Sequence, residues 1–231
     1  MVLNFFGNGA GFADEHTSAY FFTATNEMVI IDCSFTTFQK IKHMDLKNCE
    51  KFYVLVTHTH GDHVGGLGLF VQYAYFTLKK PVTIVAPSMA VAVDIGALLT
   101  IEGNDKSWYS IKTVHNLEED WFYKAILTTH APHLDNKCFG YYLNVNGTNV
   151  VYTGDTSTLQ PFVPYLTEGS ELYVDTSVYY GMIHLKLEDA LDNFIILTKS
   201  GVKVYLMHLD DVSAAEKIVA DIPNIEVVTV V

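Results

Sequence analysis

A single stretch, THTHGDHVGG at residues 57–66, limits what this chain can fold into. It crowds four potential metal ligands into six positions, namely His58, His60, Asp62 and His63. The stretch follows KFYVLV at residues 51–56, whose apolar and β-branched side chains predict a buried strand. A turn directly after a buried strand can project several side chains into one small volume. We therefore expect the end of this strand to carry a compact polar site.

The spacing within the stretch indicates how the four side chains can meet. His58 and His60 are two residues apart, so they share one face while the chain stays extended. Asp62 and His63 are adjacent and converge with the first two only if Gly61 lets the chain bend. Three crowded histidines without a metal would repel one another on protonation. Neutral imidazole and carboxylate bind zinc, and also iron or manganese, so the pattern predicts a metal site.

The same stretch resembles the signature loop of the metallo-β-lactamase fold superfamily. The resemblance implies an α/β (α+β) fold, an αββα sandwich of two mixed β-sheets flanked by helices, with a metal site at one edge. The order of expected elements is compatible with it, because a strand-rich part leads to a part in which strands and helices alternate. No linker or repeat divides the chain, so we expect one hydrolase domain over residues 1–231. Residues 102–120 are more polar and predict an irregular excursion followed by a strand.

The family pattern implies three further ligands in chain order. The first is a histidine shortly before a Gly-Tyr strand, and TTHAPHLDNKCFGYYL offers both His130 and His133. We favour His133, because it is nearer to that strand. The second is Asp155, because TNVVYTGDTS resembles the strand-GDT motif of the family. The third is His208, which ends the expected strand in VKVYLMHLD.

The resemblance also implies how these ligands share two divalent ions, which we expect to be zinc, with manganese or iron as alternatives. One ion would be held by His58, His60 and His133. The other would be held by Asp62, His63 and His208. Asp155 and a water or hydroxide would lie between the two ions, and paired cations favour hydroxide near neutral pH. By the same resemblance, Asp32 is a structural carboxylate beneath the site and not a ligand.

A second resemblance concerns the branch of the superfamily. His184 in YYGMIHLKLEDAL, and the glycine-rich opening FFGNGAGF, resemble the ribonuclease Z and small phosphodiesterase branches. In those branches a histidine before a helix lies near the leaving group. His184 suits the role of general acid because histidine titrates close to neutral pH. The resemblance thus implies Asp62 and His184 as catalytic residues.

The net charge of the chain distinguishes between a small anionic substrate and a nucleic acid. The chain carries 14 basic and 26 acidic residues, a net charge of −12, which disfavours binding along a phosphate backbone. It also lacks the long basic, glycine- and proline-rich insertion that ribonuclease Z uses to grip RNA. We therefore expect a small anionic substrate, and we do not expect nucleic acid or membrane as a partner. Five aromatic residues are available to contact a base: Trp108, Tyr109, Tyr141, Tyr179 and Tyr180.

These observations favour a dinuclear metal-dependent phosphodiesterase that cleaves a small phosphodiester, such as a cyclic nucleotide, by hydroxide attack. The alternatives are a lactonase, thioesterase or β-lactamase-type carbonyl hydrolase, and a ribonuclease Z-like RNA endonuclease. Three widely spaced cysteines, the lack of a signal-like start and the lack of a long apolar segment favour the cytoplasm. The resemblance further implies a homodimer.

Overall fold

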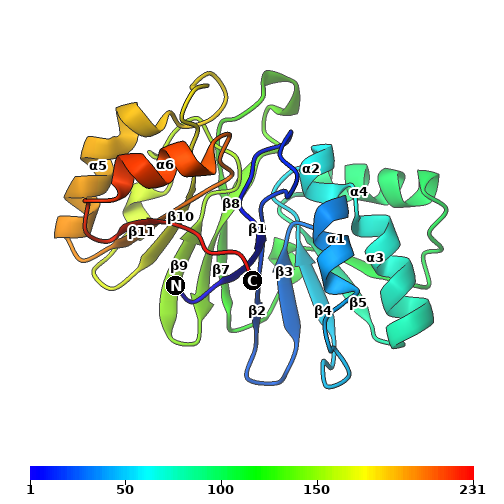
Figure 1. Cartoon of the computed structure of the whole chain (residues 1–231). Coiled ribbons are helices and arrows are strands. Elements are labelled where there is room, and N and C mark those ends of the chain that lie inside the picture. The colour runs from blue at the N-terminus through cyan, green and yellow to red at the C-terminus, as the bar shows by residue number, and fades with distance from the viewer.

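Two six-stranded sheets pack face to face in the computed structural model, which describes residues 1–231 (Figure 1). The first sheet has its strands in chain order: β1 (Asn4–Gly7), β2 (Ser18–Phe22), β3 (Met28–Ile31), β4 (Phe52–Leu55), β5 (Val82–Ala86) and β6 (Ser110–Thr113). The second sheet also follows the chain: β7 (Phe122–Leu127), β8 (Phe139–Val145), β9 (Thr148–Tyr152), β10 (Glu171–Asp175), β11 (Lys203–Met207) and β12 (Ile225–Val227). Both sheets mix parallel and antiparallel pairs, as expected.

Helices cover the outer face of each sheet. Four accompany the first sheet: α1 (Phe35–Ile41), α2 (Gly61–Val64), α3 (Leu67–Tyr73) and α4 (Met89–Ile101). Two accompany the second sheet: α5 (Leu187–Lys199) and α6 (Val212–Val219). A π-helical turn, Ala74–Leu78, extends α3, and short 3₁₀ turns occur at Val114–Asn116, Pro132–Leu134 and Val163–Tyr165. None of these helices combines the length and the apolar character needed to cross a lipid bilayer.

Apolar side chains form three layers, which define the αββα sandwich. One layer lies between the sheets and includes the buried rings of Phe5, Tyr53 and Tyr141. A second lies between the first sheet and its helices, and a third between the second sheet and α5 and α6. Inner strands such as β4 are therefore buried on both faces, which is why FYVL at Phe52–Leu55 is apolar throughout and does not alternate.

Parallel strands bring the functional segments to one edge of the sandwich. In the first sheet, β3, β4 and β5 run parallel, and in the second sheet β9, β10 and β11 do the same. The segments that follow β4, β7, β9, β10 and β11 carry the candidate site residues. The carboxyl ends of parallel strands are the usual place for a site in such sheets.

Strand β6 lies within residues 102–120, for which we expected an irregular excursion followed by a strand. It pairs in parallel with β5 at the edge of the first sheet. Only Thr113 among its four residues is buried. An edge strand with little buried surface has no apolar pattern by which the sequence could indicate its bounds.

Candidate metal centre

The loop after β4 is held from below by one buried carboxylate, Asp32. Its two oxygens accept hydrogen bonds from the backbone N–H of Thr57 at 2.8 Å and from the Thr57 hydroxyl at 2.7 Å. His63 Nδ1 donates to the same carboxylate at 2.8 Å, which leaves Nε2 of the ring for the site above. The chain bends where α2 begins at Gly61, as the spacing of the histidines required. Asp32 thus orients the loop from beneath the site, where the resemblance placed it.

A first group of ligand atoms gathers His58, His60, His130 and Asp155, all within 4.8 Å of one another. His60 Nδ1 lies 3.0 Å from His58 Nε2 and 3.3 Å from His130 Nε2. Asp155 Oδ2 lies 3.8 Å from His58 Nε2 and 3.5 Å from His130 Nε2. Three imidazole nitrogens and one carboxylate oxygen thus face one small volume.

A second group gathers Asp62, His63, Asp155 and His208, also within 4.8 Å. His63 Nε2 lies 3.2 Å from Asp62 Oδ2 and 3.3 Å from Asp155 Oδ1. His208 Nε2 lies 3.3 Å from Asp62 Oδ2 and 3.4 Å from Asp155 Oδ2. Asp155 belongs to both groups, so it lies where one carboxylate could contact an ion in each of them.

The third histidine of the first group is His130, which corrects our preference for His133. His130 is buried, and its Nδ1 donates to the carbonyl of Ile183 at 2.7 Å, so Nε2 turns toward the group. His133 is exposed on the 3₁₀ turn Pro132–Leu134 and contacts only the outer nitrogen of His60, Nε2 to Nε2 at 3.0 Å. That turn directs His133 to the rim, although it stands nearer to the next strand in sequence.

The donor set fits divalent cations. Burial, together with the neighbouring imidazoles, lowers the pKa of His58 and of His60, so both rings present neutral lone pairs. Burial alone would raise the pKa of Asp62, but hydrogen bonds from His208 and His63 hold it below its ordinary value. The neutral imidazoles of His58 and His60, together with ionised carboxylates, are donors that bind divalent cations.

His63 Nε2 is buried and faces both Asp62 and Asp155. Burial alone would lower the pKa of His63 and of His208, but the charge of Asp155 outweighs burial and raises both, to about 10 for His208. A bound cation would replace the proton on each of these two rings.

His184 lies beside both groups and is held by an aspartate that the sequence interpretation missed. His184 Nδ1 donates to Asp175 Oδ2 at 2.8 Å, and its ring centroid is 4.9 Å from that of His130 and 5.0 Å from that of His208. Asp175 is fully buried at the end of β10 and also accepts the backbone N–H of Thr156 at 2.8 Å. The position of Asp175 at the end of an apolar strand could have identified it as a candidate site residue.

The charge on Asp175 sets the protonation of its histidine. Burial alone would lower the pKa of His184, but the hydrogen bond and charge of Asp175 outweigh burial and raise the pKa above its ordinary value. His184 and Asp175 also form an overlapping ligand group with Asp155 and His208. The pair therefore favours the protonated form of the imidazole next to the two candidate ion positions.

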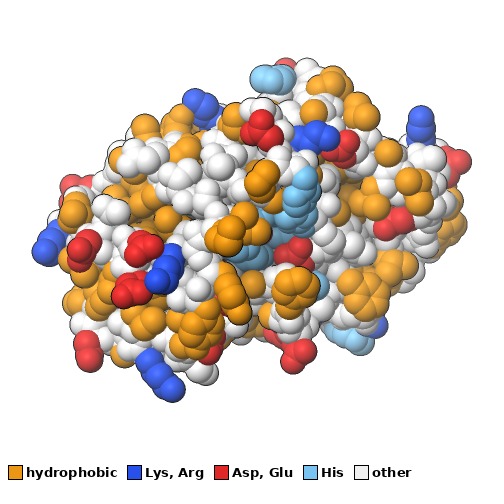
Figure 2. Space-filling view, turned by 90° about the horizontal axis from the view of Figure 1, so that it is seen from above, with side chains coloured by type: hydrophobic (Ala, Val, Ile, Leu, Met, Phe, Trp, Pro, Cys, Tyr) orange, Lys and Arg blue, Asp and Glu red, His pale blue; other side chains and the backbone are white.

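The histidines line a depression between the two sheets, and hydrophobic side chains lie along its rim (Figure 2). Segments next to the site carry exposed apolar side chains, Phe12 beside Gly11 and Tyr179 and Tyr180 before His184. A side chain at Gly11 would meet Asp62, at 3.0 Å from Oδ2, so the glycine-rich turn rests directly on the site.

The other three aromatic residues that we considered for base contact lie elsewhere. Tyr141 is buried between the sheets, where its hydroxyl donates to the carbonyl of Val56. Trp108 and Tyr109 precede β6, at the opposite end of the first sheet. Only Tyr179 and Tyr180 therefore stand near the candidate metal centre.

The two sheets, the outer helices and this donor set define a protein of the metallo-β-lactamase fold, with the ligand arrangement of a metal-dependent hydrolase. The family model described as Anti-Pycsar protein Apyc1 matches residues 1–222, and the chain belongs to this family. An Anti-Pycsar protein Apyc1 from Bacillus phage 010DV004 is 22% identical over 233 residues, covering 91% of this chain and 90% of the relative.

Solved structures of low sequence identity share the fold. A diphosphatase from the PhnP family superposes with a TM-score of 0.72 at 17% identity, over 99% of this chain and 94% of that one. Human tRNase Z, short form, gives a TM-score of 0.63 at 16% identity, over 90% of this chain and 92% of that one. These similarities establish the architecture in which the site is placed.

Proposed function

We propose that this chain is a dinuclear metal-dependent phosphodiesterase that cleaves a small phosphodiester, most simply a cyclic nucleotide. The observation that carries the proposal is the His184–Asp175 pair, which sets a proton donor against both ligand groups. An alkoxide leaving from phosphorus needs a proton, and a positioned imidazolium can supply it.

The ligand groups would hold two divalent ions, which we propose to be zinc. One group is His58, His60 and His130, the other is Asp62, His63 and His208, and Asp155 belongs to both. Bound ions would supply an activated water and neutralise the charge that develops on the phosphate oxygens. Manganese or iron would also suit these nitrogen and oxygen donors.

The chain's own residues would control the protons. His184 is held by Asp175 through Nδ1, so Nε2 remains free to protonate the leaving oxygen. Asp62 stays ionised and is a hydrogen-bond acceptor at the edge of the second group, where it would orient the attacking water. These are the two residues to which we assign catalysis.

Charge and family membership support the choice of substrate. A net charge of −12 disfavours a long polyanion, whereas one phosphodiester can be neutralised by the ions alone. The Anti-Pycsar description of the family is consistent with degradation of a cyclic nucleotide. The exposed rings of Tyr179 and Tyr180 would contact the base. We further propose a homodimer, and a reducing cytoplasm as its setting, since all three cysteines are buried and unpaired.

Leaving-group dependence tests the proposal. Metal-loaded protein would be assayed with cyclic nucleotides, which release an alkoxide, and with bis(p-nitrophenyl) phosphate, which releases a stable phenolate. His184→Ala should lower cyclic-nucleotide cleavage ~10²–10⁴-fold and cleavage of the p-nitrophenyl ester much less. His43→Ala, an exposed histidine just past the end of α1, is the matched control.

A panel of other substrates separates the alternatives. Cleavage of a lactone or thioester that survives His184→Ala, with no phosphodiester cleavage, would identify a carbonyl hydrolase. Cleavage of a transfer RNA precursor in preference to cyclic nucleotides would identify a ribonuclease Z-like endonuclease. Either result would overturn the proposal.

A further inference from the structure

A second hollow lies at the opposite end of the first sheet from the histidines. Strands β5 and β6 run parallel, and the hollow is lined where they begin, at Val82, Thr83 and Ser110, whereas the metal centre lies beyond the carboxyl ends of the parallel strands. Its volume is about 560 Å³, within the usual range for small-molecule sites. The mechanism proposed above makes no use of it.

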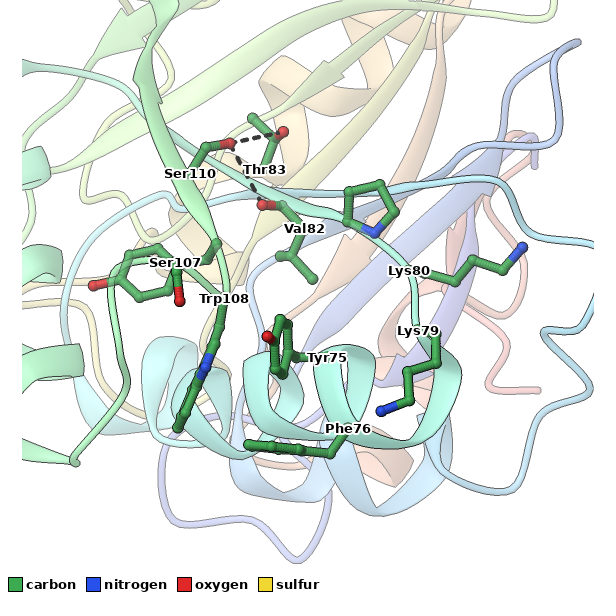
Figure 3. Close-up of a pocket in the computed structure, with 11 residues that line it drawn as sticks. Tyr75, Phe76, Lys79, Lys80, Val82, Thr83, Ser107, Trp108 and Ser110 are labelled. Carbon is green, nitrogen blue, oxygen red and sulfur yellow. Dashed lines mark hydrogen bonds between the residues drawn. The ribbon is translucent and has the colours of Figure 1, made fainter.

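Three aromatic rings form one wall of this hollow (Figure 3). Tyr75 and Trp108 stack with ring centroids 5.5 Å apart and an interplanar angle of 26°. Phe76 meets Trp108 edge-on at 4.9 Å. Tyr75 and Phe76 are exposed despite their size, so a ring system without a covering partner faces solvent. Aromatic faces of this kind bind other planar rings by stacking.

The charge of the hollow is opposite to that of the chain. None of its 11 lining residues is Asp or Glu, although the whole chain has a net charge of −12. Lys79 and Lys80 both line it, and neither makes an ion pair. The ammonium of Lys79 turns toward the aromatic wall, 6.0 Å from the Phe76 ring centroid, whereas Lys80 extends away from the rings (Figure 3). An unpaired ammonium beside exposed rings is a place for an anionic group.

Hydroxyl groups complete the lining. The Ser110 hydroxyl donates to Thr83 Oγ1 at 3.1 Å (Figure 3), so both side chains are held in place at the base of the hollow. The nearby carboxylate of Asp105 is already engaged, because it accepts the backbone N–H and the hydroxyl of Ser107 at 2.8 and 2.7 Å. Asp105 keeps its negative charge, but it makes no ion pair with Lys79.

From these features we propose that the hollow is a second ligand site, which binds a mononucleotide apart from the metal centre. The base stacks on the ring wall of Tyr75, Phe76 and Trp108, and the phosphate meets the ammonium of Lys79. A planar ring that carries an anionic group can contact both the aromatic wall and the ammonium of Lys79.

Tryptophan fluorescence offers a local readout of binding. The chain has two tryptophans, and Trp121 is buried between the sheets. Its indole N–H has no hydrogen-bond partner, so Trp121→Phe loses no hydrogen bond and leaves Trp108 as the sole reporter. Adenosine 5′-monophosphate, added to this variant after removal of metal by a chelator, should quench the fluorescence in a saturable way. Adenosine alone and inorganic phosphate should each bind more weakly.

Lys79→Asn tests the anion contact. Lys79 has a left-handed backbone (φ +57°), which asparagine tolerates, so the change removes the charge without new strain. We expect it to weaken nucleotide binding about tenfold, because a charge-assisted hydrogen bond is lost. Lys47→Asn, an exposed lysine outside the hollow, is the matched control and should leave the dissociation constant unchanged.

Two outcomes would overturn the proposal. One is no saturable quenching with the mononucleotide. The other is a dissociation constant that Lys79→Asn leaves unchanged. Because the titration uses metal-free protein and reports on Trp108, its failure would not bear on the phosphodiesterase proposal, and failure of that proposal would not bear on this site.

Discussion

Replacing Asp175 by asparagine isolates the contribution of one buried charge to the proposed proton donor. Asparagine keeps the shape of the side chain and an oxygen that can accept from His184 Nδ1, now 2.8 Å from the carboxylate, so the ring should stay in position. The negative charge is lost, and the oxygen that lies 3.4 Å from His208 Nδ1 is replaced by an amide nitrogen, so the metal content of the variant has to be measured as well. His184 is mostly shielded from solvent, so the loss is weakly screened.

The expected size follows from that contact. A hydrogen bond to a charged group contributes ~1.5–3 kcal/mol, and one pKa unit corresponds to ~1.4 kcal/mol. The pKa of His184, now raised by Asp175 against the effect of burial, should therefore fall by about one to two units in Asp175→Asn. Because the proton donor is active in its protonated form, activity is lost as pH rises through this pKa. The alkaline limb of the profile should move to lower pH by the same amount.

The assay is the pH dependence of kcat for a cyclic nucleotide, compared with bis(p-nitrophenyl) phosphate, which needs no proton on its leaving group. A shift of the alkaline limb for the first substrate and not for the second would support the reasoning. Metal content and thermal unfolding of the variant must match those of the parent protein. An unshifted profile, or an equal shift for both substrates, would refute the role assigned to the pair.

Three further predictions concern the site and its support. His130→Ala should lose one equivalent of bound metal and His133→Ala should retain both, as measured by plasma mass spectrometry; the reverse would restore the original assignment. Gly154→Ala should lower the free energy of unfolding by at least ~2 kcal/mol in urea denaturation, because Gly154 has φ +60° and its new Cβ would lie 2.6 Å from a backbone carbonyl oxygen. Gly96→Ala, inside α4 and with no close contact for a new Cβ, should instead raise the free energy of unfolding by up to ~1 kcal/mol, and equal losses in the two variants would argue against a steric cause. Burial alone would raise the pKa of Asp210, but hydrogen bonds from a hydroxyl and two backbone N–H groups outweigh burial and lower this pKa. The ionised Asp210 therefore stabilises the fold above about pH 4, and this stabilisation is lost as pH falls through the pKa of the folded state. Asp210→Asn should then lose less stability than the parent protein between neutral pH and about pH 3, in the same denaturation assay.

Part of the site could be predicted from the sequence, because several of its residues lie close together in the chain. Four ligands lie within one loop, and their spacing with Gly61 specified the bend that the structure shows. Asp155 and His208 each follow an apolar strand, so their place at the sheet edge was also predictable. Strands buried on both faces were visible in the sequence as apolar runs. These runs did not by themselves distinguish two sheets from one, so the two-sheet architecture was predicted from the resemblance of the histidine loop.

The remaining features depend on turns and on contacts between distant segments. The choice between His130 and His133 rests on a three-residue 3₁₀ turn that reverses which side chain points inward. Asp175 becomes part of the site only because β10 lies between β9 and β11 in the second sheet. Edge strand β6 has too little buried surface to leave a pattern. Distance along the chain carries no information about any of these three.

The positions of bound ions test the central claim most directly. Crystals of protein loaded with zinc would be measured at the zinc absorption edge, where anomalous differences locate the metal. We predict two peaks on either side of Asp155, one among His58, His60 and His130, and the other near Asp62, His63 and His208. A single peak, no peak, or a peak bound by His133 in place of His130 would contradict the account.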